Sequence, residues 1–180
     1  SPFLNSKTTL FDAGVHLPLI VRIPGQTPGL ANPNLVSFID LLPTFLDAAG
    51  APPYKGRRKG RSLLPILESE TLLPDWEIVF GSHTLHEITN YWPTRFLRTS
   101  RYKYHRNVAW KLDFPFSGDL YGSLSWQGMR RQRPVMIGER PLESYVRRPA
   151  EELFDLQSDP AEVQNLASDP GHEDVLAEFR

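Results

Sequence analysis

A residue suited to binding an anion stands near the start of the chain. Lys7 is followed by two hydroxyl residues, Thr8 and Thr9, in a segment whose residues predict turns. The lysine ammonium is a compact positive charge with three donors, and it binds phosphate-like oxyanions as a point charge. Lys7 is therefore a candidate anion contact. A lysine in a surface loop is the alternative that the residues alone leave open.

A second group of candidates follows the short apolar run 78–80, where the end of a strand can present side chains to a cleft. The group consists of His83, His86 and Glu87. The spacing of the histidines also suggests a metal pair, but a loop with no third ligand is a weak metal signal. We therefore predict no metal site here. Ligand contacts and a surface loop with local hydrogen bonds both stay open.

Composition limits the remaining choices. The chain has 180 residues, 40% of them hydrophobic, and a formal net charge of −1. This is long enough for one domain, or for one domain and part of another. The near-neutral charge argues against a dedicated nucleic-acid binder, and no apolar run is long enough to span a bilayer. The absence of cysteine excludes disulfides, thiolate metal sites and a cysteine nucleophile in these residues.

Proline and the two chain ends suggest short elements in a longer protein. The 17 prolines are about twice the usual share and imply many fixed turns. The first residue falls within a loop-like stretch, and the last helical pattern stops without a cap. We therefore expect a fragment of a longer chain.

The first third of the sequence predicts an apolar strand and a short helix. Residues 17–23 are nearly all apolar and read as a buried strand that stops at Pro24. Asp40 is typical of a helix N-cap, and Gly50 suits the position after a helix end. We expect a helix over residues 41–49, packed by one face.

A basic connector follows over residues 51–62. Its cations could form a nucleic-acid or heparin patch, but no aromatic strand platform accompanies them, so we favour a solvated loop. These cations are Lys55, Arg57, Arg58, Lys59 and Arg61.

The later part of the chain predicts short strands. Residues 94–98 and 102–106 flank a three-residue turn and read as an antiparallel hairpin. Residues 152–156 predict another strand, and residues 173–179 predict a terminal helix. The stretch 111–150 is poorly periodic, so we expect a long, partly extended insertion.

These elements predict an α/β to α+β fold. Residues 1–62 resemble the edge of a larger α/β layer, and residues 63–180 resemble a small, truncated antiparallel sheet domain packed by a helix.

Other charged residues have simpler interpretations. The cations of the hairpin could line a groove for an anionic sugar, but a solvated basic face is the favoured alternative. They are Arg98, Arg101, His105 and Arg106. We expect Asp12 to form a turn and His16 to be a hydrogen-bonded structural histidine.

Several segments, in a fixed order, carry a family resemblance. They are residues 7–14 (KTTLFDAG), 18–25 (PLIVRIPG), 37–50 (SFIDLLPTFLDAAG), 60–65 (GRSLLP), 152–160 (ELFDLQSDP) and 165–167 (NLA). Together they resemble the C-terminal half of the type I, formylglycine-dependent sulfatases. Residues 81–89 (GSHTLHEIT), the hairpin and residues 114–116 are similar to the sulfamidase (heparan N-sulfatase) subgroup.

The resemblance implies an alkaline-phosphatase-like fold with a smaller C-terminal sheet domain. It implies a hydrolase that cleaves sulfate esters or sulfamates of glycosaminoglycans, including N-sulfoglucosamine. Lys7 matches the family lysine that contacts the substrate sulfate, which makes it the catalytic candidate. His86 and Glu87 match a His-Glu pair of the subgroup, and we expect them, with His83, to bind the sugar.

The resemblance also implies cofactors whose residues are not in this sequence. Family members use formylglycine, made within a C/S-x-P-x-R motif, and a calcium ion held by Asp and Asn oxygens. Neither the motif nor a cluster of six or more oxygen ligands occurs here. We expect both groups to lie upstream and this piece alone to be inactive.

Partners and compartment follow from the same resemblance. We expect a sulfated glycan substrate and the remainder of a sulfatase chain as partners, and neither nucleic acid nor a membrane span. An apolar face left without its neighbouring strands would favour a homodimer or aggregation. Family members are periplasmic, secreted or lysosomal.

Two other functions stay open. A phosphodiesterase or phosphonate hydrolase could use the same superfold, because fold does not fix chemistry. The chain could also be a non-catalytic carbohydrate-binding module.

Overall fold

The computed structural model describes residues 6–52, 60–133 and 136–180. They form two compact units. One combines the described part of Ser1–Leu17 with Phe80–Arg180, and the other is Pro18–Val79.

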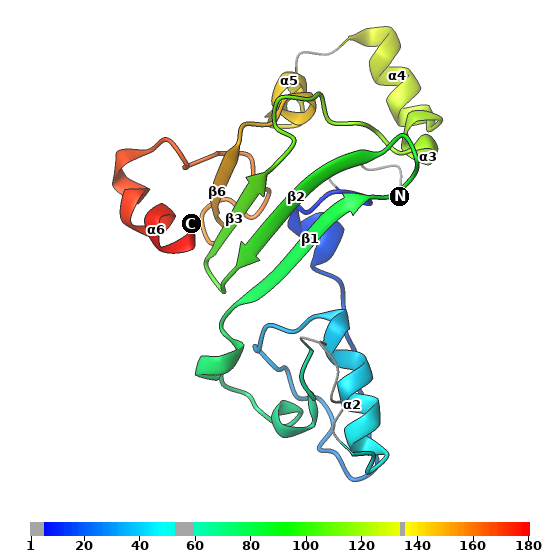
Figure 1. The fold of residues 1–180 in the computed structure, drawn as a ribbon, viewed down its shortest axis with the longest axis vertical. Helices are drawn as coiled ribbons and strands as arrows, with labels where there is room; N and C mark the ends of the chain where they lie inside the picture. Colours follow the sequence, from blue (N-terminus) through cyan, green and yellow to red (C-terminus); the bar gives the residue numbers. More distant parts are fainter. Residues whose placement is uncertain (1–5, 53–59, 134–135) are drawn as a thin grey trace. The chain divides into compact units, whose positions relative to one another are not determined.

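A four-stranded sheet is the framework of the first unit (Figure 1). Its order is β1 (Val79–Leu85), β2 (Tyr91–Arg98), β3 (Tyr102–Asn107) and β6 (Glu151–Asp155). Strands β2 and β3 form the predicted hairpin, in which Arg98 is opposite Lys103. The predicted strand near residue 152 pairs antiparallel with β3. Both sequence predictions are confirmed.

One face of this sheet is apolar and is covered by the C-terminal helix. Side chains in a strand alternate between faces, so Tyr102 and Tyr104 share a side. Tyr104 packs with Leu153 of β6 and with Leu176 of α6 (Glu173–Phe179), the helix that the sequence predicted. A short turn, η4 (Pro170–His172), precedes this helix.

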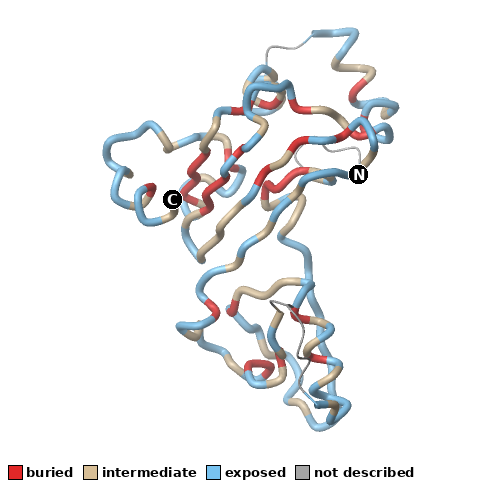
Figure 2. The backbone as a smooth tube through the Cα atoms, in the orientation of Figure 1, coloured by how far each residue is buried: buried red, intermediate tan, exposed pale blue. Residues whose placement is uncertain are grey.

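The opposite face of the sheet is buried but largely charged. Lys103 and His105 of β3 lie beside Phe154 and Glu152 of β6, respectively. Each of these four side chains is less than 4% exposed. Figure 2 shows the buried stretches that run along β3 and β6. The helical turn α1 (Asp12–Val15) contributes to this layer through Asp12.

The segment between β3 and β6 contains short helices. These are α3 (Gly118–Tyr121), α4 (Leu124–Gln132) and α5 (Leu142–Val146), with a two-stranded ribbon of β4 (Met136–Ile137) and β5 (Arg140–Pro141). The sequence did not predict these helices, whereas the ribbon and the irregular residues 113–117 fit the expected partly extended insertion. The helices form because they can bury aromatic side chains against β2, which a sequence period does not reveal. That cluster contains Trp92, Phe114, Leu120, Trp126 and Tyr145.

The second unit contains the predicted helix, α2 (Leu41–Ala48). Asp40 does not cap α2 with its side chain but ends a preceding turn, η1 (Phe38–Asp40), in a capping box with Ser37. Two further turns, η2 (Leu64–Ile66) and η3 (Pro74–Trp76), supply its small core of Leu63, Ile66, Leu67 and Trp76.

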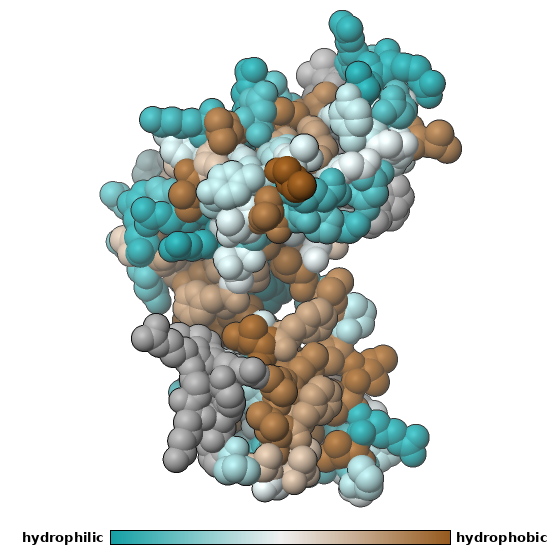
Figure 3. Space-filling view, turned by 45° about the vertical axis from the view of Figure 1, so that its right-hand side comes forward, coloured by the Kyte–Doolittle hydropathy of each residue, from teal (hydrophilic) through white to brown (hydrophobic). Residues whose placement is uncertain are grey.

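The predicted buried strand over residues 17–23 is wrong. These residues have no regular structure, and Ile20 is 91% exposed. A strand needs a neighbour for its backbone groups, and no described strand pairs with this run. Hydrophobic side chains instead gather on one side of this unit (Figure 3). The exposed set includes Leu19, Ile20, Val21, Ile23, Phe38, Ile39, Leu42 and Phe45.

The predicted small antiparallel sheet packed by a helix is confirmed. The predicted domain boundary after residue 62 stays a prediction, and the basic connector lies mostly outside the described residues. Its described member Arg61 stacks on Trp76 at 3.4 Å. Within the described ranges no helix has the length and hydropathy that a membrane crossing requires.

Candidate functional site

A strained turn presents Lys7. The backbone N–H and hydroxyl of Thr9 both donate to the carbonyl oxygen of Ser6, at 3.1 and 2.9 Å. Within this turn Thr8 has a φ of 70°, which is unusual for a β-branched residue and costs of the order of 1–3 kcal/mol. Such strain is maintained only where the surroundings fix the backbone, so the position of Lys7 is well determined.

Gly14 of α1 packs closely against this turn. A Cβ atom at Gly14 would lie 2.3 Å from the carbonyl oxygen of Ser6 and 2.7 Å from that of Thr9. Only a residue without a side chain allows this close approach. The sequence around Lys7 therefore combines a strained turn with the one residue type that can pack against it.

Asp119, in the first turn of α3, holds the ammonium of Lys7. The two side chains form an ion pair of 2.5 Å, and they are 43% and 45% exposed. The hydroxyl of Ser117 donates to the other carboxylate oxygen at 2.6 Å. The hydrogen bonds from Lys7 and Ser117 lower the pKa of Asp119 far below its usual value. Lys7 is thus fixed in place and still accessible.

Glu87 reaches the same short segment from the β1–β2 loop. Its carboxylate accepts the backbone N–H of Gly118 at 3.0 and 3.2 Å. A Cβ atom at Gly118 would lie only 3.2 Å from Glu87 Oε2. Lys7 and Glu87, which are 80 positions apart, therefore contact adjacent residues of α3.

Buried Asn90 fixes the loop that carries Glu87. Its backbone donates to the carbonyl of Glu87 at 2.9 Å and accepts from the N–H of His86 at 3.3 Å. Its side-chain amide donates to the carbonyl of Pro115. Asn90 thus ties the β1–β2 loop to the chain just before α3.

The two histidines differ in their surroundings. His86 lies at the edge of the site, with Nε2 3.8 Å from Glu87 Oε1. His83 is half-buried in β1, and both its ring nitrogens lack a hydrogen-bond partner within the described part. Burial lowers the pKa of His83, and the positive charges of His86 and Arg148 act in the same direction. Burial therefore disfavours the protonated form of His83.

The structure brings two of the four predicted site residues together, since Lys7 and Glu87 contact Asp119 and Gly118, respectively. His86 contacts only its neighbour Glu87 in this group, and His83 makes no hydrogen bond to it among the described residues. Sequence reasoning missed Asp119 and Asn90. Asp119 looks like an ordinary first-turn acid, and its role depends on a contact across 112 positions. The motif at residues 81–89 could have drawn attention to Asn90, which follows it directly.

The cations of the hairpin differ in their surroundings. Arg98 and Lys103 bind the carboxylate of Asp12 at 3.0 and 2.7 Å, so Asp12 is an ion-pair centre as well as a helix residue. His105 is fully buried, 3.6 Å from Glu152. Arg101 pairs with Asp155 at 2.8 Å. Arg98 and His105 therefore form neither a sugar groove nor a solvated face. Arg101, whose side chain is 51% exposed, and Arg106 stay at the surface, as the favoured alternative predicted.

Metal coordination finds no support in the residues that the structure covers. No three His, Asp or Glu side chains among them gather closely enough to hold an ion. The acids of the candidate site are already engaged by Lys7 and by the backbone of Gly118. The site can hold an anion against an ammonium and can hydrogen-bond a polar ligand, but it does not fit a calcium ion.

The chain matches a known protein family. The family model described as "N-sulphoglucosamine sulphohydrolase, C-terminal" matches residues 4–112. The chain belongs to this family. The matched range includes Lys7, His83, His86 and Glu87, whereas Asp119 lies beyond it.

Known proteins of this sulphohydrolase family and of related sulfatases match nearly the whole chain. The chain is 34% identical to human N-sulphoglucosamine sulphohydrolase, covering 99% of this chain and 38% of that protein. It is 31% identical to an ulvan-active sulfatase of Formosa agariphila, covering 96% and 33%. The chain thus spans about a third of the length of these relatives. A solved 2-O GAG sulfatase matches with 27% identity and a TM-score of 0.48, covering 77% of this chain and 22% of that one.

Proposed function

We propose that the full-length protein is a sulfatase that hydrolyses the N-sulfate of glucosamine residues in glycans, and that this chain supplies one wall of its substrate site. The observation that supports this most is the meeting of Lys7 and Glu87 at Gly118 and Asp119. Family membership and the identity to human N-sulphoglucosamine sulphohydrolase supply the substrate class.

Lys7 is the sulfate contact in this proposal. When the bond from sulfur to the leaving nitrogen or oxygen breaks, negative charge grows on the sulfate oxygens and on the leaving atom. A positive charge that is already fixed in position stabilises that transition state without reorganisation. Asp119 and the Ser6–Thr9 turn fix Lys7, and its exposure leaves an ammonium proton for the sulfate.

His86 and Glu87 are the sugar contacts. The carboxylate of Glu87 is oriented by the N–H of Gly118 and still has lone pairs for a sugar hydroxyl or a sulfamate N–H. Burial lowers the pKa of His83, and in its neutral form the imidazole can accept one hydrogen bond and donate another.

The formylglycine nucleophile and the calcium ion belong to the remainder of the chain in this proposal. When bound, calcium would neutralise the sulfate oxygens, but the residues described here do not hold it.

The remainder of the chain, about two thirds of a relative's length, is also the proposed cover for the apolar side of Pro18–Val79. A homodimer through that side is the rival. Light scattering of the full-length protein decides between them, since a monomer supports coverage within one chain.

The function is tested with the full-length protein on N-sulfoglucosamine, an O-sulfated glucosamine and a phosphonate monoester. We expect a clear preference for the N-sulfate. Equal or absent activity on it would reject the proposed substrate, and a preference for the phosphonate would support the alternative hydrolase.

A substitution tests the proposed role of Lys7. Lys7→Ala should lower kcat/KM roughly 10²–10³-fold, the usual effect of removing one charge-stabilising donor, with the melting temperature unchanged. Arg131→Ala, which removes an exposed cation of α4, is the matched control and should retain full activity. Wild-type kinetics in Lys7→Ala would reject this role.

A further inference from the structure

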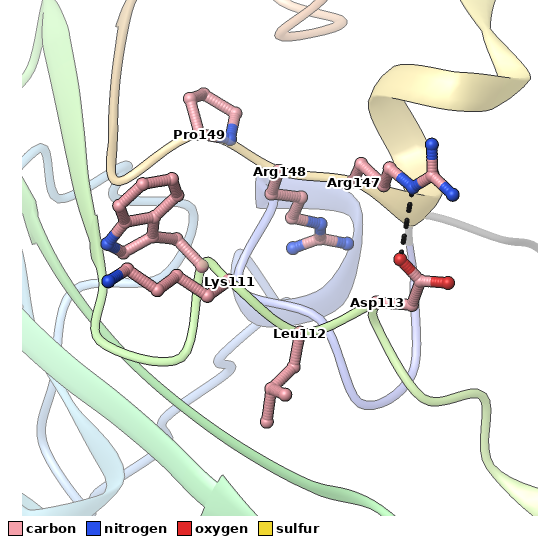
Figure 4. A pocket seen from close by; sticks show the side chains of 7 residues that line it. Lys111, Leu112, Asp113, Arg147, Arg148 and Pro149 are labelled. Atoms are coloured by element: carbon pink, nitrogen blue, oxygen red, sulfur yellow. Dashed lines mark hydrogen bonds and ion pairs between the residues drawn. The ribbon is translucent and has the colours of Figure 1, made fainter.

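A groove lies between two neighbouring chain segments of the first unit. Residues 110–113 form one side and residues 147–149 the other, enclosing about 580 Å³. Backbone hydrogen bonds from Phe114 to Val146 and from Asn107 to Ala150 hold the segments together at 2.7 and 2.8 Å. Figure 4 shows that side chains from both segments surround the groove. None of its residues belongs to the Lys7 site.

The charge of this groove is mainly positive. Lys111, Arg147 and Arg148 line it, against a single carboxylate, that of Asp113. Arg147 is already neutralised by Asp113 at 3.2 Å and by Glu143 at 2.8 Å. Lys111 forms no ion pair with any described residue and lies 5.6 Å from the ring centre of Trp110. Two cations are therefore left for an incoming anion.

Arg148 is an unusual residue for a protein interior. It is only 2% exposed, its Nη2 has no described hydrogen-bond partner, and burial lowers its pKa. Its guanidinium is held by aromatic rings instead of a directly bonded carboxylate. The ring centres lie 4.1–5.4 Å away and belong to Phe11, Trp92, Phe114 and Tyr145.

The charges of Glu152 and Glu162 favour the charged guanidinium, although no carboxylate is hydrogen-bonded to it within the described residues. Because Arg148 lines the groove, its positive charge attracts an anionic group there together with that of Lys111. Arg148 is thus a buried source of positive charge, and Lys111 is the cation that can contact the anion.

Trp110 gives the groove an apolar wall. It is 46% exposed, and its neighbour Leu112 is 56% exposed. The carbon face of a pyranose ring packs well on an indole, whereas its charged substituents need cations beside the ring. Trp110 next to Lys111 offers both.

We infer that this groove binds a carboxylated or sulfated saccharide unit of the glycan at some distance from the unit being cleaved. The inference rests on the proposed function for its ligand class. Asp113 and Gly118 are five positions apart in the sequence, so their backbones are at most about 18 Å apart. A glycan of a few sugar units spans that distance.

The experiment compares a short and a long substrate with the full-length protein. One substrate is N-sulfoglucosamine, and the other is a tetrasaccharide of alternating uronic acid and glucosamine with N-sulfoglucosamine at its non-reducing end. The variants are Trp110→Ala, Lys111→Ala and Lys111→Arg, with Arg131→Ala as the control. Trp110 and Lys111 lie at the surface, so the variants should keep the wild-type melting temperature.

We expect Trp110→Ala and Lys111→Ala each to lower the ratio of tetrasaccharide to monosaccharide kcat/KM roughly tenfold, the equivalent of one good contact. The change should appear in KM, and Lys111→Arg should restore most of the ratio. Arg131→Ala should leave the ratio at the wild-type value. An unchanged ratio in both alanine variants would overturn the inference.

Direct binding separates this inference from the proposed function. If the protein hydrolyses neither substrate, the proposed function fails, and calorimetric titration with the tetrasaccharide still tests the groove. Binding that is lost in Trp110→Ala and Lys111→Ala supports the groove. Absent binding, or binding that these variants leave unchanged, rejects it.

Discussion

Two lysine–aspartate pairs in the first unit have the same chemistry and opposite surroundings. Lys7 and Asp119 meet at 2.5 Å with 43% and 45% of their side chains exposed. Lys103 and Asp12 meet at 2.7 Å with 0% and 15% exposed. Each pair joins segments about 100 positions apart, separated by 112 and 91 residues. Burial, and not pair chemistry, distinguishes them.

The buried pair is part of a larger group of charges. Asp12 also accepts from Arg98, and Lys103 is also 3.2 Å from Glu162. Burial raises the pKa of Glu162, whereas hydrogen bonds from Arg98 and Lys103 outweigh burial and lower the pKa of Asp12. Every member is fixed by the others. No N–H of Lys103 faces solvent, so this pair holds α1 to the sheet and cannot receive a ligand.

The exposed pair contributes little to stability, because water competes for both charges. What it provides is position, since Asp119 keeps the Lys7 ammonium at one place without burying it. The comparison indicates that a lysine–aspartate pair can either position a ligand contact or hold the fold together. Solvent access decides which of these two roles the pair has.

The largest expected difference between the pairs is in stability. Asp12→Ala in the full-length protein removes the shared partner of Arg98 and Lys103, which should destabilise the fold by about 3–5 kcal/mol. A urea unfolding series measures this. Asp119→Ala is the matched control and should leave the unfolding midpoint unchanged. Similar losses of unfolding free energy in Asp12→Ala and Asp119→Ala would contradict the proposed difference between the buried and the exposed pair.

The second largest loss of stability should follow a substitution of Asn90, which supports the site. Asn90→Ala leaves the carbonyl of Pro115 without its donor in a buried place, which should cost about 1–3 kcal/mol. It should also lower activity, because the loop of His86 and Glu87 loses its link to α3. Thr89→Ala, an exposed neighbour, is the control for both measurements. If the Asn90→Ala variant is destabilised but keeps wild-type activity, other contacts hold the loop of His86 and Glu87 in place.

Local patterns in the sequence predicted the hairpin and the helices α2 and α6. The alternation of side-chain types within residues 94–106 is sufficient to predict β2 and β3, because these paired strands are neighbours along the chain. The helices α3, α4 and α5 could not be predicted this way. They depend on Trp126 and Tyr145 packing against Trp92, a tertiary effect that overrides weak periodicity. The apolar run around Ile20 shows the opposite case, because its local pattern is typical of a strand but no described strand pairs with it.

The candidate site was predictable in its residue types and not in its contacts. Lys7 and Glu87 belong to recognisable motifs, but nothing local connects either of them to Asp119. The burial of Lys103 was equally hidden, because a lysine in a hairpin is normally solvated and Asp12 reads as a turn former. Pairs across about 100 positions appear only when the fold is known.

A smaller effect on activity should separate position from charge at the exposed pair. Asp119→Asn keeps the shape of the side chain and loses the charge that holds Lys7. In the full-length protein, kcat/KM should fall roughly tenfold or more, as for a misplaced catalytic group. The melting temperature should stay unchanged. The loss should appear in kcat more than in KM, and Asp119→Glu should recover part of it.

The matched control for Asp119→Asn is Glu178→Gln, which removes an exposed acid from α6. If both variants retain wild-type kinetics, Asp119 does not position Lys7. If Asp119→Asn lowers the melting temperature as well, the pair is structural, and the contrast with Lys103 is weaker than proposed.

The smallest expected effect concerns a third, half-exposed ion pair and its pH dependence. Glu151 accepts hydrogen bonds from Tyr104 at 2.6 Å and from Arg180 at 2.7 Å. The bonds from Arg180 and Tyr104 lower the pKa of Glu151 from 4.5 to about 2. A lowered carboxyl pKa stabilises the folded state above the unfolded value and loses that effect as pH falls toward the folded value.

The advantage of wild type over Glu151→Gln should therefore be constant above about pH 5 and should fade between about pH 4.5 and 2. It should stay within about 1 kcal/mol, as for other pairs in contact with solvent. Urea unfolding at pH 7, 4 and 3 measures it. A difference that grows on acidification would have the wrong sign and would mean that Glu151 is not held as a carboxylate. A difference as large as that of Asp12→Ala would mean that burial is not what separates the two classes of pair.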